Sequence, residues 1–233
     1  MAQNLTTVGF DADDTLWHNE RFFQLTQARF AELLADHAAP DHLAERLLAA
    51  ERRNIGHYGF GIKGFVLSMI ETALEVTDNR VPGDVIAELI AAGQEMLSHP
   101  IELMPHAQAA VEAAAETHRV LLITKGDLLD QERKLAQSGL GELFHGVEIV
   151  SDKTPRVYAE IFARPGAGAD RGLMVGNSMK SDVVPMIRAG GWGVFLPGSL
   201  SWALEHAEAP QESPRFREIP DLSGLAPVLE AIG

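Results

Sequence analysis

Short apolar runs alternate with helical patterns along much of the chain, and this alternation constrains the fold more than any other feature. Five runs predict β-strands, at Leu5–Phe10, Arg119–Ile123, Val147–Val150, Gly172–Val175 and Gly193–Leu196. Helices are predicted between most of them, from Pro105 to about His118, from Asp127 to Gly139 and from Ser181 to Ala189. This order favours a parallel sheet with helices on both faces. We therefore expect an α/β fold with a doubly wound, Rossmann-like parallel sheet.

The first connection between strands is much longer than the others. More than 100 residues separate Phe10 from Arg119, whereas a minimal crossover needs about 10 to 12. Residues 1–16 and 101–233 are predicted to form the Rossmann-like core, and residues 17–100 an inserted all-helical cap domain. Within the cap, residues 51–65 (ERRNIGHYGFGIKGF) contain four glycines, which predict a loop. Residues 207–216 are predicted to be a surface connection to a last helix at Leu222–Ile232.

Composition excludes several classes of function. The chain has no cysteine, which removes thiol nucleophiles, disulfides and cysteine-ligated zinc. Its formal net charge of −14 argues against nucleic-acid binding, which needs clustered Lys and Arg. It has no run of eighteen apolar residues and no signal-peptide pattern at its start. We therefore expect a soluble, cytoplasmic protein, monomeric or homodimeric, that binds no membrane and is free to take a small anionic substrate.

Polar and charged side chains follow four of the predicted strands. In an open parallel sheet, residues after the carboxyl ends of the strands gather at one edge. They are Asp11, Asp13 and Asp14 after the first strand, Thr124 and Lys125 after the second, Ser151, Asp152 and Lys153 after the third, and Asn177, Ser178 and Asp182 after the fourth. Crowded carboxylates without a Cys or suitably spaced His favour Mg²⁺. Lysine and threonine beside such a cation suit a phosphoryl group.

Four segments resemble, in order, the four motifs of the haloacid dehalogenase (HAD) superfamily. They are VGFDADDTL, LLITKGD, SDKTPRVYAEIF and MVGNSMKSD. The resemblance implies that Asp11 is the nucleophile and that Asp13 acts first as acid and then as base. It also implies that Thr124 and Lys153 bind the transferring phosphoryl group.

The resemblance further implies a Mg²⁺ site. Its ligands would be a carboxylate oxygen of Asp11, the backbone carbonyl of Asp13 and a group from the fourth motif. Asn177 stands where the family usually has an aspartate, so either Asn177 or Asp182 would supply that group. The third motif also departs from the family's commoner Lys-Pro, because Thr154 separates Lys153 from Pro155.

The function that follows from this resemblance is Mg²⁺-dependent hydrolysis of a small phosphorylated metabolite through an aspartyl-phosphate. An acid at the Asp13 position distinguishes phosphatases from the family's dehalogenases, which attack carbon without a metal. A 2-haloacid dehalogenase-like hydrolase, a phosphotransferase, a phospho-receiver domain and a non-catalytic phosphate-binding protein remain as alternatives. Receivers are about half this length and have no helical insertion. Lys63 and Arg52, in the predicted cap, are candidates for substrate binding.

Overall fold

A computed structural model describes residues 4–164, 167–198, 200 and 202–233. Contacts between Cα atoms divide the chain into two compact units. Unit 1 comprises Met1–Glu20, Ile101–Lys125 and Gln131–Gly233, and unit 2 comprises Arg21–Pro100 and Gly126–Asp130.

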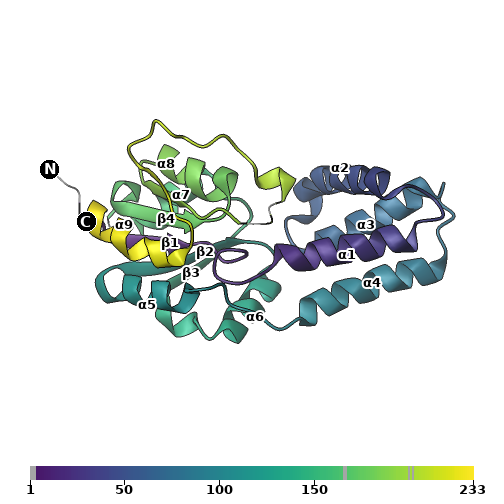
Figure 1. Cartoon of the computed structure of the whole chain (residues 1–233), viewed down its shortest axis with the longest axis horizontal. Helices are drawn as coiled ribbons and strands as arrows, with labels where there is room; N and C mark the ends of the chain where they lie inside the picture. The colour runs from purple at the N-terminus through teal and green to yellow at the C-terminus, as the bar shows by residue number, and fades with distance from the viewer. Residues whose placement is uncertain (1–3, 165–166, 199, 201) are drawn as a thin grey trace. The chain divides into compact units, whose positions relative to one another are not determined.

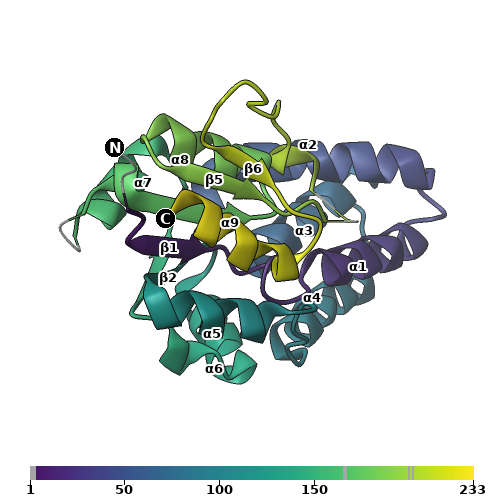
Figure 2. The same ribbon diagram turned by 60° about the vertical axis from the view of Figure 1, so that its left-hand side comes forward.

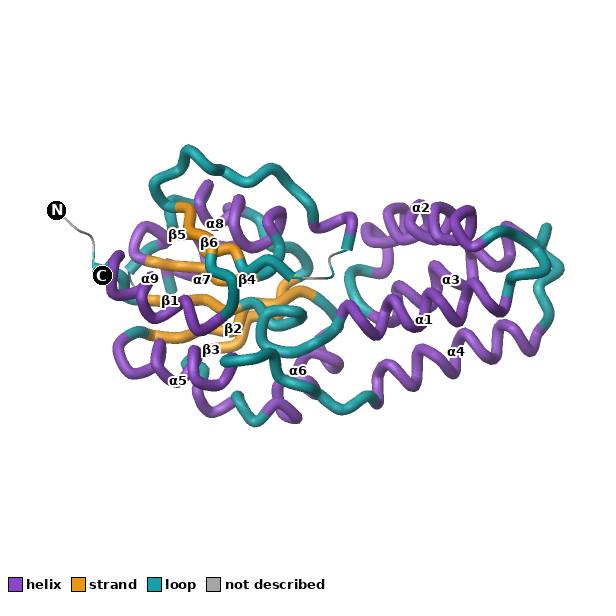
Figure 3. Tube along the Cα trace, in the orientation of Figure 1, coloured by secondary structure: helices purple, strands orange, loops and turns teal. Residues whose placement is uncertain are grey.

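Unit 1 is built on a six-stranded, fully parallel sheet (Figure 3). The strands are β1 (Thr7–Phe10), β2 (Arg119–Lys125), β3 (Gly146–Val150), β4 (Gly172–Gly176), β5 (Trp192–Phe195) and β6 (Phe216–Glu218). Their spatial order is β3-β2-β1-β4-β5-β6. The chain therefore winds outward in both directions from β1, which confirms the predicted doubly wound α/β fold.

Helices cover both faces of this sheet (Figure 2). On one face, α5 (Ala107–Thr117) and α9 (Leu225–Ile232) pack against alternate strand residues such as Phe10 and Leu122. On the other, α7 (Pro155–Ala163) and α8 (Val184–Arg188) pack against residues such as Ile123 and Met174. The central strands β1 and β4 are largely apolar on both faces because both of their faces are buried.

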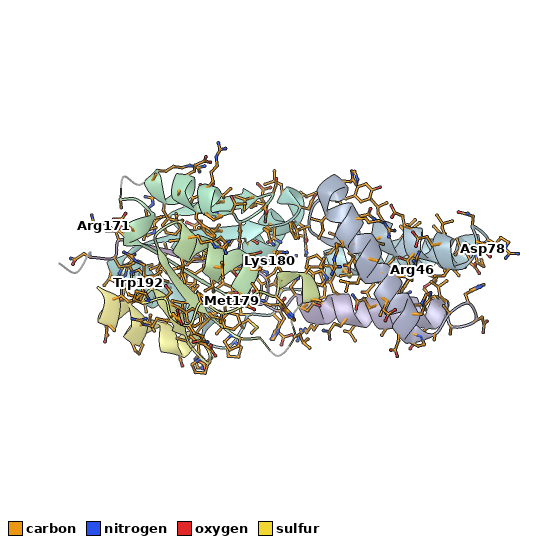
Figure 4. All side chains as sticks on the ribbon, turned by 90° about the horizontal axis from the view of Figure 1, so that it is seen from above. Arg46, Asp78, Arg171, Met179, Lys180 and Trp192 are labelled. Atoms are coloured by element: carbon orange, nitrogen blue, oxygen red, sulfur yellow. The ribbon has the colours of Figure 1, made fainter. Side chains whose placement is uncertain are left out.

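Two parts of unit 1 differ from the sequence prediction. The segment predicted as a surface connection ends in β6, whose Phe216 pairs with Gly193 of β5. This strand has only three residues and lies at the sheet edge, so it carries no alternating pattern. The helix predicted from Ser181 begins instead with a π-helical turn, Met179–Val183, and continues as α8. Met179 and Lys180 stand at the start of that turn (Figure 4).

Unit 2 consists mainly of four helices (Figure 1). They are α1 (Glu20–Leu33), α2 (Pro40–Tyr58), α3 (Ile62–Val76) and α4 (Gly83–Ser98). Their inward faces share one apolar core that includes Phe30, Leu47, Phe65, Met69 and Leu89. Helix α6 (Leu128–Ser138) has its first residues in unit 2 and the rest in unit 1.

The loop predicted at residues 51–65 is mostly helix, and that prediction was wrong. Only Gly59 and Gly61 have positive φ values, 74° and 118°, and they make the short turn between α2 and α3. Gly56 lies in α2 with nothing within 4 Å of an added Cβ. Gly64 lies in α3, where an added Cβ would come within 3.1 Å of the Gly59 oxygen. Glycine thus serves two different purposes here, which a count of glycines does not distinguish.

Among the helices of the described residues, none has the length and apolar character needed to cross a bilayer.

Candidate active site

Asp11 follows the last residue of β1, at the carboxyl edge of the sheet. Its backbone N–H donates to the Val175 carbonyl of β4, 3.0 Å away, and the residue is 7% exposed. The Oδ1 atom accepts a hydrogen bond from Lys153 Nζ at 2.5 Å, and Oδ2 accepts one from Thr15 Oγ1 at 2.9 Å. Both oxygens of this carboxylate are therefore held in fixed directions.

Lys153 joins two carboxylates inside the protein. It lies beyond the end of β3, is 3% exposed, and donates to Asp182 Oδ1 at 2.7 Å as well as to Asp11. Burial alone would lower the pKa of Lys153, but the charges of Asp11 and Asp182 outweigh burial and raise it. The structure thus brings an ammonium group with a raised pKa against the Asp11 carboxylate.

Asp182 is fully buried in the π-helical turn after β4. Its Oδ2 atom accepts a hydrogen bond from the Ser178 N–H at 2.9 Å, and its Oδ1 atom accepts the one from Lys153. Burial and the nearby Asp11 raise the pKa of Asp182 to about 7, against the opposing effect of Lys153. Gly176 makes room for this side chain, because an added Cβ would lie 2.2 Å from Asp182 Oδ2.

The side-chain amide of Asn177 lies against two oxygens of the β1 loop. The inward-facing amide atom is 3.2 Å from Asp11 Oδ2 and 3.3 Å from the Asp13 carbonyl oxygen. With nitrogen inward, the amide donates to both of them. With oxygen inward, three oxygens face one another, an arrangement that a cation would stabilise.

These three oxygens fit a magnesium ion. Within the described part of the chain, no group of three acidic or histidine side chains is arranged to hold a metal. A metal here would therefore depend on backbone and amide oxygens as well as on Asp11. Such hard oxygen donors are the kind that Mg²⁺ prefers. Asn177 fits a ligand role better than Asp182, because its side chain lies beside Asp11 Oδ2 and the Asp13 carbonyl, whereas Asp182 is joined to Asp11 through Lys153.

The Asp13 carboxylate accepts hydrogen bonds from three side chains. The Oδ1 atom accepts hydrogen bonds from Trp17 Nε1 at 2.7 Å and from Lys134 Nζ at 2.9 Å. The Oδ2 atom accepts from Gln131 Nε2 at 2.9 Å and again from Lys134 at 3.1 Å. This carboxylate is 23% exposed, so it is held and still reached by solvent.

Thr124 lies near the carboxyl end of β2 and is 1% exposed. Its hydroxyl donates to the Lys125 carbonyl at 3.2 Å and to Gln131 Oε1 at 3.4 Å. Among the described residues, no hydrogen bond joins Thr124 to Asp11 or Lys153. The structure therefore brings together Asp11, Lys153, Asn177 and Asp182, and connects Thr124 to Asp13 only through Gln131.

Lys63 and Arg52 both lie in unit 2. Lys63, in the first turn of α3, forms an ion pair with Asp127 at 2.9 Å. This pair lowers the pKa of Asp127, chiefly through the hydrogen bond from Lys63. Arg52 is exposed on α2. Their roles in substrate binding stay predictions.

Known proteins provide an independent comparison. The hydrolase family described as haloacid dehalogenase-like hydrolase matches residues 5–190. The chain belongs to this family. A haloacid dehalogenase-like hydrolase from Xanthomonas campestris is 40% identical, with a TM-score of 0.88 over 99% of this chain and 92% of that one.

Two further members of the comparison are more distant. A glyceraldehyde 3-phosphate phosphatase from Methanothermobacter thermautotrophicus is 25% identical over 97% of this chain and 100% of its own. The putative HAD-hydrolase YfnB from Bacillus subtilis, bound to magnesium, is 18% identical, with a TM-score of 0.67 over 97% of this chain and 99% of that one. The last likeness shows the fold alone.

Sequence reasoning missed five residues of this HAD hydrolase site. Trp17, Gln131 and Lys134 contact Asp13, and Thr15 contacts Asp11. Gln131 and Lys134 are three positions apart on a predicted helix and so share one face, but the sequence does not indicate which face of that helix turns inward. Thr15 lies within the quoted first motif.

Glu205 is the fifth missed residue. It lies in a short 3-10 turn, Ala203–Glu205, where its carboxylate accepts hydrogen bonds from Lys125 Nζ at 2.6 Å and from Ser178 Oγ and Ser181 Oγ at 2.5 Å. Burial would raise the pKa of Glu205, but Lys125 and the two hydroxyls outweigh burial and lower it. No short-range pattern links residue 205 to residue 125.

Proposed function

We propose that this HAD hydrolase is a Mg²⁺-dependent phosphomonoester hydrolase that forms an aspartyl-phosphate on Asp11. The observation that carries the proposal is the pairing of two differently held carboxylates on one loop. Asp11 is oriented by Lys153 and Thr15, whereas Asp13 is held by Trp17, Gln131 and Lys134. Two carboxylates in different environments suit different roles, one as nucleophile and one as acid and base.

In the first step, an oxygen of Asp11 attacks phosphorus and the ester oxygen leaves with a proton from Asp13. In the second, Asp13 takes a proton from water as the water attacks the aspartyl-phosphate, which releases inorganic phosphate and regenerates Asp11. The Lys153 ammonium group neutralises charge on the transferring group. Thr124, near the carboxyl end of β2, is proposed to bind that group as well.

Asp11 Oδ2, the Asp13 carbonyl and Asn177 would hold the Mg²⁺, with Asp182 orienting Lys153. A bound Mg²⁺ would supply positive charge for the phosphoryl oxygens and reduce their repulsion from Asp11. The 25% identical relative supports a small phosphorylated substrate, because its name is that of a phosphatase acting on a three-carbon phosphate.

Asp11→Asn tests the proposal. Release of phosphate from an aryl phosphate in the presence of Mg²⁺ should fall at least about 10³-fold, because an amide oxygen is a poor nucleophile. Acid-quenched wild-type protein should carry a phosphoryl group on the peptide that contains Asp11, detected by mass spectrometry. Asp78→Asn is the matched control, because Asp78 is an exposed aspartate of unit 2.

Undiminished turnover in Asp11→Asn would overturn the mechanism. Halide release from a 2-haloacid without metal, together with no phosphatase activity, would favour the dehalogenase alternative. Phosphate that stays on Asp11 without turnover would favour a receiver, and reversible binding of phosphate without any covalent product would favour a binding protein. Transfer of the phosphoryl group to an added alcohol in preference to water would favour a phosphotransferase.

A further inference from the structure

Helix α6 buries polar side chains where a helix on a sheet normally buries apolar ones. Gln131 and Lys134 are 3% and 6% exposed, whereas Leu128 and Leu129 are 60% and 70% exposed. The two polar residues are three positions apart, so they lie on the same face of the helix. A lysine is almost never fully buried unless it is paired. The burial of Gln131 and Lys134 therefore indicates that these side chains bind a polar group inside the protein.

That partner is Asp13. Lys134 donates to both carboxylate oxygens, at 2.9 and 3.1 Å, and Gln131 donates to Oδ2 at 2.9 Å. Trp17, whose ring is fully buried, donates to Oδ1 at 2.7 Å. These bonds come from two different parts of the chain, the loop after β1 and α6. Together they fix both the position and the rotation of the carboxylate.

Gln131 is itself held in one orientation. Its Oε1 atom accepts a hydrogen bond from Thr124 Oγ1 at 3.4 Å, which leaves Nε2 directed at Asp13. Lys134 is fixed in a similar way, since its Nζ also donates to Asn19 Oδ1 at 2.8 Å. A group that transfers a proton must lie within hydrogen-bond reach of the reacting oxygen, and supporting residues with fixed rotamers keep it there.

We propose that Gln131 and Lys134 are positioning residues that hold the Asp13 carboxylate for proton transfer. This inference rests on the proposed function, in which Asp13 is both the acid of the first step and the base of the second. The Asp13 carboxylate accepts a hydrogen bond from Gln131 and two from Lys134, whereas Gln131 is also bonded to Thr124 and Lys134 to Asn19. Their effect on the reaction is therefore expected to pass mainly through Asp13.

Loss of this support has two distinct kinetic consequences. A basic alkoxide leaves poorly without a proton, whereas a nitrophenolate leaves well without one, so kcat/KM should fall mainly for alkyl phosphates. The second step needs the base whatever the first leaving group was. A nitrophenyl substrate should therefore show a rapid burst of nitrophenolate, equal to the enzyme concentration, followed by slower turnover.

Lys134→Met is the main test, because it keeps the length of the side chain and removes its donor. We expect kcat/KM to fall roughly tenfold or more for glycerol phosphate and by less than about threefold for p-nitrophenyl phosphate. The first loss is larger because general acid catalysis typically raises a rate by about 10² to 10⁴-fold. A burst should appear in stopped-flow with the nitrophenyl substrate. Lys134→Arg, which restores a cationic donor, should recover part of the loss.

Two further variants complete the design. Gln131→Met removes a neutral donor to Asp13. It should lower the ratio of kcat/KM for glycerol phosphate to kcat/KM for p-nitrophenyl phosphate, as Lys134→Met does. Gln137→Met is the matched control, because Gln137 is an exposed glutamine of the same helix. It should leave both the ratio and the burst unchanged. Circular dichroism and thermal unfolding confirm that each variant is folded.

Equal losses of kcat/KM on both substrates, with no burst, would overturn the positioning role and leave the phosphatase proposal intact. Unchanged kinetics in both Lys134→Met and Gln131→Met would also overturn it. If Lys134→Met does not fold, Gln131→Met decides the question by the same ratio and burst. If the wild-type protein hydrolyses neither phosphate ester, the proposed function fails, and this inference fails with it.

Discussion

Asn177 is the residue at which this chain departs from the usual fourth motif of its superfamily. With its oxygen turned inward, the amide would bring a third oxygen to the place where Asp11 Oδ2 and the Asp13 carbonyl meet, but it brings no charge. The carboxyl groups of Asp11 and Asp182 share the ammonium group of Lys153. Because ligand charge tunes affinity for hard cations, this set should bind Mg²⁺ more weakly than a set with one more carboxylate.

Asn177→Asp should therefore strengthen Mg²⁺ binding. We expect the half-saturating Mg²⁺ concentration to fall roughly tenfold, because a carboxylate replaces an amide against a divalent cation. The apparent melting temperature in excess Mg²⁺ should rise relative to that in EDTA, and this measurement is independent of activity. Without metal, the variant should be less stable than the wild type, because a third carboxylate then joins Asp11 and Asp182.

Asn177→Ala is the companion variant, since it removes the oxygen and adds no charge. It should raise the half-saturating Mg²⁺ concentration. An identical Mg²⁺ dependence in wild type, Asn177→Asp and Asn177→Ala would contradict a ligand role for this residue.

At the scale of elements, the 3-10 turn Ala203–Glu205 binds residues at the carboxyl ends of β2 and β4. Glu205 accepts from Lys125, at the end of β2, and from two serines of the turn after β4. Lys180 adds a bond from that same turn to the Leu204 carbonyl at 2.7 Å. These contacts hold the fourth motif in addition to its backbone connection to β4.

The lowered pKa of Glu205 sets the pH dependence of this contact. The folded state binds its proton less tightly than the unfolded state, whose carboxyl titrates near 4.5. The ionised carboxylate therefore contributes stability that is fully present above pH 4.5. That contribution is lost as the pH falls through the lower pKa of the folded state.

Glu205→Gln should lower the free energy of unfolding at pH 7 by about 1 to 3 kcal/mol, the range for losing a hydrogen-bonded charge. The difference from wild type should shrink as the pH falls below 4.5. Urea titrations at neutral and acidic pH measure both effects. Glu160→Gln, which breaks the exposed pair with Arg156, should change stability little at either pH. A difference that stays constant with pH would contradict the assignment to Glu205 ionisation.

At the scale of the whole molecule, the two units have separate apolar cores. The core of unit 1 includes Leu122 and Leu173, and that of unit 2 includes Leu47 and Met69. The two clusters share no residue. Burial of apolar surface is the main stabilising force in each, so local damage should stay within one unit.

Leu47→Ala and Leu122→Ala make a matched pair, because both leucines are 1% exposed. Each should destabilise its own unit by about 2 to 5 kcal/mol through lost contacts and a cavity. Amide hydrogen exchange should become faster in α2 and α3 for Leu47→Ala, and in the central strands for Leu122→Ala. Equal acceleration across the whole chain in both variants would show that the units open together.

The fold and the central residues of the site were predictable because their signals are local. Buried parallel strands are short apolar runs, and the sheet brings the residues after them to one edge whatever the loops do. The predictions for Asp11, Lys153, Asn177 and Asp182 needed only the order of strands to place them together. The short edge strand β6 was not predicted, because three residues are too few to show an alternating pattern. The helical part of residues 51–65 was not predicted, because a count of glycines says nothing about their φ values.

The sequence by itself determined the parallel sheet, the long insertion and the identity of the groups at the strand ends. Only the tertiary structure decided what holds those groups. Gln131 and Lys134 reach Asp13 across 118 and 121 residues of chain, and Glu205 reaches Lys125 across 80. Such contacts depend on which face of a helix turns inward and where a late turn packs. The packing of the whole unit determines both, so neither can be read from a short stretch of sequence.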